Sequence, residues 1–243
     1  MTRAIRRALR AAQRPIPSPN IWNWPDVYER ENEAQDADGA LWAALHDAVP
    51  WRGLDVLDVG CGDGFHLPRF AEDAASVVGV EPYGPLVERA RRRIGDRARV
   101  IEAGAQALPL PDASVDLVHA LTAYFFGPGC EPGLEEAWRV LRPGGAVAIV
   151  DLDATVAPYG EWMRADIPRY NPVRVERFFA EQGFSQLRIP TTWRFPDRAT
   201  LEAVLRIEFT REVAERAIAT TPGTAVPVGY RLHVRRKNVL PRA

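Results

Sequence analysis

The stretch Leu57-Asp58-Val59-Gly60-Cys61-Gly62-Asp63-Gly64 decides the fold of this chain. Its first residues end an apolar run typical of a buried strand, and the glycines that follow predict a tight turn that opens a helix. Gly60 and Gly62 lack side chains that would keep a ligand from the backbone, and the first turn of a helix offers unpaired N–H groups. The stretch therefore predicts a ligand-binding turn, with a purely structural turn as the alternative.

Short apolar runs alternate with helix-period stretches from Leu54 onward, as in the βαβ units of a parallel sheet. An α/β fold is therefore expected, with helices between the first five strands, at about 38–48 and at about 173–182. A further amphipathic segment at 197–219 precedes the last strand. The expected strands are 55–59, 76–80, 98–102, 115–120, 146–151, 184–195 and 226–235.

Glu81 is the second informative element, because it ends the apolar run 77–80. A carboxylate in this position, about twenty residues after a glycine turn, can accept both hydrogen bonds from a ribose diol. A strand-end Glu is often merely solvated. Its spacing from the glycine turn favours a nucleotide-like ligand here.

These elements resemble the motifs of the class I S-adenosylmethionine (SAM)-dependent methyltransferases, particularly the small-molecule group with a D-V-G-C-G-x-G motif. The resemblance covers roughly residues 54–151. Further matching segments are Val80-Glu81-Pro82, Leu108-Pro109-Leu110-Pro111-Asp112, Ser114-Val115-Asp116-Leu117-Val118 and the run EEAWRVLRPGG at 135–145. It implies a Rossmann-like three-layer sandwich whose seven-stranded sheet is mostly parallel, with an antiparallel last strand and a helical insert before it.

The resemblance also implies a set of cofactor contacts for SAM and its product S-adenosylhomocysteine (SAH). The methionine portion is expected at Asp58, Gly60, Cys61 and Gly62, the ribose at Glu81, one adenine face at Pro82 and Tyr83, and a further contact at Ala120. The family commonly has an Asp after the third strand, whereas this chain reads Ala103-Gly104-Ala105-Gln106. The Ala105 N–H and Gln106 are therefore expected to contact the adenine.

A dinucleotide-dependent dehydrogenase is the competing interpretation, since it also uses a glycine turn and an acidic residue. Its fingerprint is G-x-G-x-x-G, whereas Gly60, Gly62 and Gly64 give G-x-G-x-G. The glycine spacing therefore favours the methyltransferase.

A catalytic base is needed only for an acceptor that must lose a proton. The candidates near the expected site are His119, Tyr124 and Asp151, with Asp153 beside the last. Each has a structural alternative: core packing for the histidine, pocket lining for the tyrosine and loop carboxylates for the two acids. His66 is expected to pack or cap a helix rather than catalyse.

Composition limits the partners, location and metal content that can be expected. The chain has 243 residues, a formal net charge of -1 and 47% hydrophobic residues, which suits a globular protein and makes a nucleic-acid partner unlikely. It has no apolar run long enough to span a membrane and no secretory signal, so a cytoplasmic location is expected. Two cysteines without metal-ligand spacing predict no metal site. Composition does not predict the oligomeric state.

Two regions are expected: residues 1–50, comprising a basic arm and a helical, aromatic lid, and residues 51–243, the methyltransferase domain with its insert at 196–222. Aromatic residues outside the shared core favour a small, partly apolar or aromatic acceptor. The alternatives are a tRNA or rRNA methyltransferase, which would use the arm from Arg3 to Arg14, and a non-catalytic SAM-binding regulator.

Overall fold

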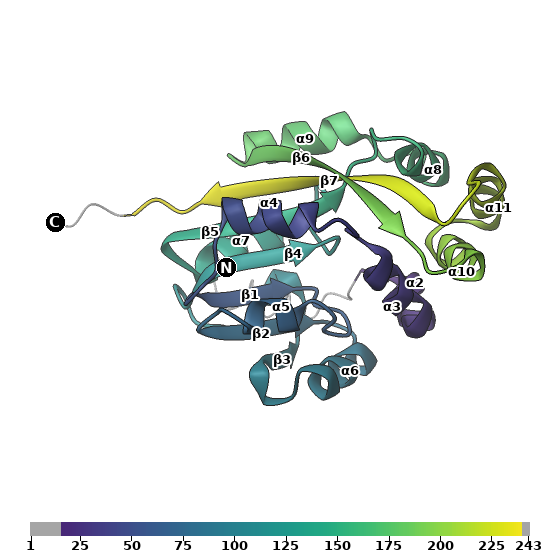
Figure 1. Cartoon of the computed structure of the whole chain (residues 1–243). Coiled ribbons are helices and arrows are strands. Elements are labelled where there is room, and N and C mark those ends of the chain that lie inside the picture. Colours follow the sequence, from purple (N-terminus) through teal and green to yellow (C-terminus); the bar gives the residue numbers. More distant parts are fainter. Residues whose placement is uncertain (1–15, 240–243) are drawn as a thin grey trace.

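The computed structural model describes residues 16–239 and contains one seven-stranded sheet of order β3-β2-β1-β4-β5-β7-β6 (Figure 1). Strands β1 to β5 pair in parallel, and β7 is antiparallel to both β5 and β6. The predicted mostly parallel sheet with an antiparallel last strand is confirmed. The strands are β1 (Asp55–Val59), β2 (Ser76–Glu81), β3 (Arg99–Glu102), β4 (Val115–Leu121), β5 (Leu141–Leu152), β6 (Ser185–Arg194) and β7 (Ala225–Arg236).

Helices cover both faces of the sheet and bury its alternating side chains. Val56 of β1 packs in a core shared with α4 (Ala40–Ala48), α5 (Leu67–Ala71) and α6 (Gly84–Ile94). Its neighbour Leu57 packs on the other face, in a core shared with α7 (Glu131–Val140) and α9 (Pro172–Glu181). Successive residues of a strand point to opposite faces, so this alternation produces the three layers.

Five helices gather beyond the carboxyl ends of β1 and β4 (Figure 1). They are α2 (Pro19–Asn23), α3 (Pro25–Ala34), α8 (Tyr159–Asp166), α10 (Arg198–Glu208) and α11 (Arg211–Thr220). No element was predicted between the fifth strand and the helix expected at 173–182, yet α8 forms there. Tyr159 and Trp162 bury one face of this short helix at helical spacing.

The helical insert before β7 consists of two helices, α10 and α11. Asp197 caps α10 by accepting the N–H of Thr200 at 2.7 Å, and Phe209 then adopts an extended backbone. Asp166 accepts the N–H of Thr210 at 2.7 Å and so fixes the start of α11 against α8. The insert is thereby attached to the end of the sheet at which α2 and α3 lie.

The predicted basic arm, Arg3 to Arg14, lies outside the described residues. Within residues 16–239 no helix is both long enough and apolar enough to cross a membrane. Of the expected lid region, α4 packs on the sheet through Leu41 and Leu45, whereas α2 and α3 lie over the carboxyl ends of the strands.

Candidate functional site

The glycine turn after β1 has a left-handed backbone, with φ of +77° at Gly60 and +56° at Gly62. A Cβ atom on Gly60 would lie 2.4 Å from the Cβ of Ala123 in the segment after β4. Both the φ angle and this close approach require glycine at position 60. The sequence suggested only that Gly60 lets a ligand approach the backbone. In the structure, Gly60 also lets the turn pack against the segment after β4.

Glu81 ties the end of β2 to this turn. Its Oε2 accepts the N–H of Gly62 at 3.2 Å, and its Oε1 accepts the N–H of Tyr83 at 3.0 Å. The side chain is buried, and burial raises the pKa of its carboxyl to about 7, although the two N–H bonds act in the opposite direction. The carboxyl group therefore lies at the junction of two strand ends, where a polar ligand can reach it.

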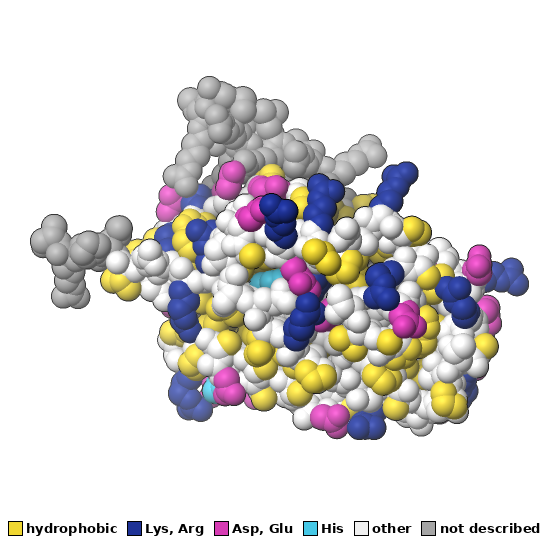
Figure 2. Space-filling view, turned by 90° about the horizontal axis from the view of Figure 1, so that it is seen from above, with side chains coloured by type: hydrophobic (Ala, Val, Ile, Leu, Met, Phe, Trp, Pro, Cys, Tyr) yellow, Lys and Arg dark blue, Asp and Glu magenta, His cyan; other side chains and the backbone are white. Residues whose placement is uncertain are grey.

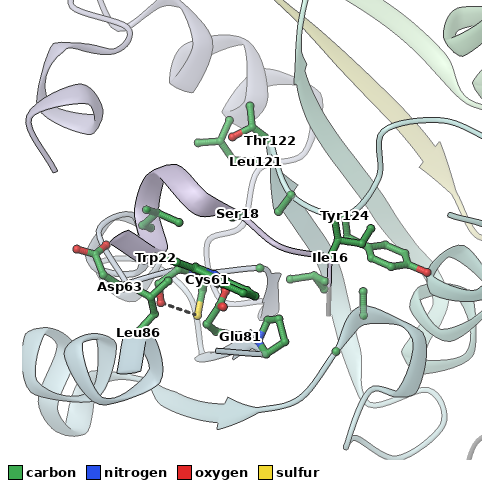
Figure 3. A pocket seen from close by; sticks show the side chains of 18 of the residues that line it. Ile16, Ser18, Trp22, Cys61, Asp63, Glu81, Leu86, Leu121, Thr122 and Tyr124 are labelled. Carbon is green, nitrogen blue, oxygen red and sulfur yellow. Dashed lines mark hydrogen bonds between the residues drawn. The ribbon is translucent and has the colours of Figure 1, made fainter. Parts of the chain in front are cut away.

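One pocket joins most of the residues predicted to bind a cofactor (Figure 3). From that set it is lined by Gly60, Cys61, Gly62, Glu81, Pro82, Ala105 and Gln106. Asp58, Tyr83 and Ala120 do not line it. Ala120 lies instead in the core beneath α7, because alternate residues of β4 face opposite sides, and Leu121 and Thr122 form the pocket wall.

Asp58 and His119 form a buried pair on neighbouring strands β1 and β4. The two residues are in register, and His119 Nδ1 lies 2.7 Å from Asp58 Oδ1. The imidazole packs against Phe70 at 5.0 Å and Trp42 at 6.0 Å between ring centroids. It lines neither of the two cavities at the carboxyl ends of the strands, so this geometry favours the core role weighed for His119 over a catalytic one.

We expect His119→Leu to lower the free energy of unfolding by about 2–4 kcal/mol, because it leaves the buried Asp58 carboxylate without its partner. Chemical denaturation measures this loss. The double variant Asp58→Asn, His119→Leu should recover part of it, since no buried unpaired charge then remains. Unchanged stability of the single variant would mean that the pair does not hold β1 to β4.

The sequence predicts a helical, aromatic lid within residues 1–50, but it does not predict that these helices line the cofactor pocket. Trp22 of α2 stacks on Tyr83, with ring centroids 4.4 Å apart, and reaches into the pocket beside Cys61 and Glu81 (Figure 3). Arg93 of α6 lies 2.9 Å from both Glu29 of α3 and Asp63 of the glycine turn. These ion pairs fix α3 over the turn. The aromatic cluster at 22–28 was the available sequence signal.

His66 lines the same pocket and makes no cap bond to α5, contrary to one of its two expected roles. Its two ring nitrogens are buried and have no hydrogen-bond partner among residues 16–239. Burial, followed by the charges of neighbouring basic groups, lowers the pKa of the imidazole to about 3. A neutral imidazole with two unpaired nitrogens is therefore available to a polar ligand.

A second cavity of about 510 Å³ adjoins the first and opens among α2, α3, α8 and α10. Tyr28 and Thr122 line both cavities, so the two spaces meet after the end of β4. Asp151 lines the second cavity and is ion-paired at 2.8 Å with the fully buried Arg231 of β7. A ligand in one cavity could therefore meet a ligand in the other near Thr122.

The remaining catalytic candidates, Tyr124, Asp151 and Asp153, differ in which cavity they line. Tyr124 lines the first pocket, but its ring points away from Glu81 (Figure 3) and lies against the backbone of Gly133. Asp153 lines neither cavity, because it accepts the N–H and hydroxyl of Thr155 and pairs with Arg188. Asp151 is thus the candidate that faces the second cavity.

The chain is similar to known methyltransferases in sequence and in fold. Residues 57–149 match a family model described as "Methyltransferase domain". A putative methyltransferase from Bacillus halodurans C-125 has a similar solved structure, with a TM-score of 0.60 at 19% identity over 81% of this chain and 98% of that one. At this identity the likeness is one of fold.

Two curated relatives are similar over the same region. The 27-O-demethylrifamycin SV methyltransferase of Amycolatopsis mediterranei (strain S699) is 36% identical over 57% of this chain and 53% of its own. The malonyl-[acyl-carrier protein] O-methyltransferase of Pectobacterium atrosepticum is 32% identical over 57% of this chain and 54% of its own. The chain therefore spans about half the length of these relatives.

Proposed function

Because its central domain places this chain in the class I SAM-dependent methyltransferase family, we propose that the protein transfers a methyl group from SAM to a small, partly apolar or aromatic acceptor. The observation that carries the proposal is the hydrogen bond from the N–H of Gly62 to Glu81, at the edge of a pocket that adjoins a second cavity. The names of the two curated relatives describe methyl transfer to 27-O-demethylrifamycin SV and to malonyl-[acyl-carrier protein], which supports the reaction class.

The residues of the first pocket fit SAM. The Glu81 carboxylate would accept hydrogen bonds from the ribose hydroxyls. Gly62 has no side chain, so its backbone would leave room for the methionine portion. The unpaired nitrogens of His66 would meet polar atoms of the cofactor. Leu86 and Ala105 would provide apolar contacts for the adenine. Once bound, SAM supplies an electrophilic methyl group.

The chain's own residues would contribute orientation and exclusion of water. Thr122 and Tyr28 lie where the two cavities meet, so they would align the acceptor atom with the methyl group. The helices α2 and α3 cover this junction, and the ion pairs between Arg93, Glu29 and Asp63 fix α3. Asp151 would serve as a base only for an acceptor that must lose a proton.

Incubation of the full chain with methyl-labelled SAM and a panel of small amines, phenols, alcohols and acids tests the proposal. We expect SAH to form with at least one acceptor class and none to form with bulk RNA. Figure 2 shows acidic and basic side chains interspersed over one face, an arrangement that does not favour a polyanion. Methylation of RNA would support the nucleic-acid alternative, and SAM binding without turnover would support the non-catalytic one.

The affinity for SAH should rise about tenfold between about pH 6 and pH 8, because a carboxyl with a pKa of about 7 becomes ionised over this range. The raised pKa means that Glu81 is partly protonated below neutrality, and a protonated carboxyl accepts hydrogen bonds from the ribose less well. Calorimetric titration across this range measures the change. Glu81→Gln should bind weakly at every pH, and an equal pH dependence in this variant would exclude Glu81 as its source.

A further inference from the structure

The second cavity has an acidic lining. Four of the described residues around it carry carboxyl groups, and none of the described lining residues is Lys, Arg or His. Asp151 is paired with Arg231 at 2.8 Å, and Asp166 accepts the N–H and the hydroxyl of Thr210. Glu31, which is buried, and Glu208, which is half-buried, interact with each other and have no cation beside them among residues 16–239.

Glu31 belongs to α3 and Glu208 to α10, two helices outside the shared core. These helices lie side by side (Figure 1). Glu208 accepts hydrogen bonds from Asn20 at 2.6 Å and from the Tyr159 hydroxyl at 3.0 Å. Glu31 is 3% exposed, and Gln35 donates to its Oε1 at 3.0 Å. Within residues 16–239, neither carboxyl group has a cationic partner.

The second oxygen of Glu31 points to a ligand. Glu31 Oε2 is buried and receives no hydrogen bond from an N–H or O–H group of the described residues. Burial, followed by the charge of Glu208, raises the pKa of Glu31. A buried carboxyl group beside a second, half-buried one is costly without a cation, so a cationic ligand would relieve it.

Aromatic rings complete the surroundings of the pair. Tyr159 packs against Trp193 at 4.9 Å and against Phe209 at 5.2 Å between ring centroids. The Trp193 Nε1–H donates to the hydroxyl of Tyr230 at 2.9 Å, which holds the indole in place. Aromatic faces and carboxylates both attract an ammonium group, whereas they give an anionic ligand no partner.

We propose that the acceptor carries a positively charged amine, and that Glu31 and Glu208 bind this group in the second cavity. The inference rests on the proposed function, because it takes this cavity as the acceptor site. An ammonium group has three N–H donors, enough to reach Glu31 Oε2 and Glu208 together. Neutral and anionic compounds of the same shape lack this interaction.

Two sets of matched compounds separate charge from shape. Phenethylamine, 2-phenylethanol and phenylacetate share one frame, and hexylamine, hexanol and hexanoate share another. Titrated into the SAH-loaded full chain, the amine of each set should bind about tenfold or more tighter than the alcohol, and the acid should bind least.

The double variant Glu31→Gln, Glu208→Gln should lose the preference for amines and keep its affinity for SAH. Glutamine retains the size of the side chain and removes like charges, so we expect the variant to melt no earlier than the wild type. Glu212→Gln, at an exposed position of α11, removes one charge away from the cavity and should change nothing. The two single variants show which carboxyl group contributes more.

The outcomes distinguish this inference from the proposed function. Amines that bind no better than alcohols or acids, or a preference that survives in the double variant, would overturn the inference. So would the absence of amine binding to a chain that binds SAH, while the cofactor site would stand. Failure of the wild-type chain to bind SAH would instead count against the proposed function.

Discussion

Replacement of Glu81 by alanine is expected to weaken SAH binding by about 100-fold or more, because hydrogen bonds to a charged acceptor contribute about 1.5–3 kcal/mol each and the ribose diol offers two. The change also removes the acceptor for the N–H groups of Gly62 and Tyr83 and so loosens the glycine turn. Calorimetric titration with SAH measures the effect, and circular dichroism checks that the variant is folded.

Glu102 provides a matched control for this variant. It ends β3 directly opposite Glu81 in the register of the sheet, but it is exposed and does not line the first pocket. Glu102→Ala should therefore keep the affinity of the wild type. Equal affinities of the two alanine variants for SAH would remove Glu81 from the cofactor site.

Gly60→Val is expected to abolish detectable SAH binding and to destabilise the fold. The new Cβ would lie 2.4 Å from that of Ala123, at a φ angle of +77° that branched side chains avoid. The segment after β4 must then move away, which disrupts the wall of the first pocket at Thr122. Titration with SAH and thermal unfolding measure the two effects.

Gly53→Val separates backbone strain from the steric clash. Gly53 has a similar φ of +73°, and a Cβ there would meet nothing within 4 Å. The strain of a left-handed residue costs about 1–2 kcal/mol in either variant, so the excess destabilisation of Gly60→Val reports the contact with Ala123. Wild-type affinity in Gly60→Val would show that the turn does not adjoin the cofactor.

The sequence was most informative where the pattern is local. The apolar runs predict the positions of the first five strands. The spacing of Glu81 from the glycine turn predicts that the turn and the Glu81 side chain meet at one edge of the sheet. Parallel strands end at the same edge of a sheet, so this part of the site follows from topology. The direction of the Ala120 side chain does not follow from topology, because a shift of one residue along β4 moves a side chain to the other face.

The acceptor side could not be predicted, because it depends on contacts between distant segments. Glu31 and Glu208 belong to helices at opposite ends of the chain, and neither carries a motif. The helix α8 was not predicted, since a helix of eight residues leaves too short a pattern to recognise. His66 and Trp22 enter the first pocket only through the way α5 and α2 pack.

The most direct test of SAM binding at the glycine turn is calorimetric titration of the full chain with SAH, beside NAD under identical conditions. We expect SAH to bind with a dissociation constant in the micromolar range or below, and NAD to give no heat of binding. Binding of NAD alone would favour the dehydrogenase, and binding of neither would contradict the assignment of this pocket to SAM.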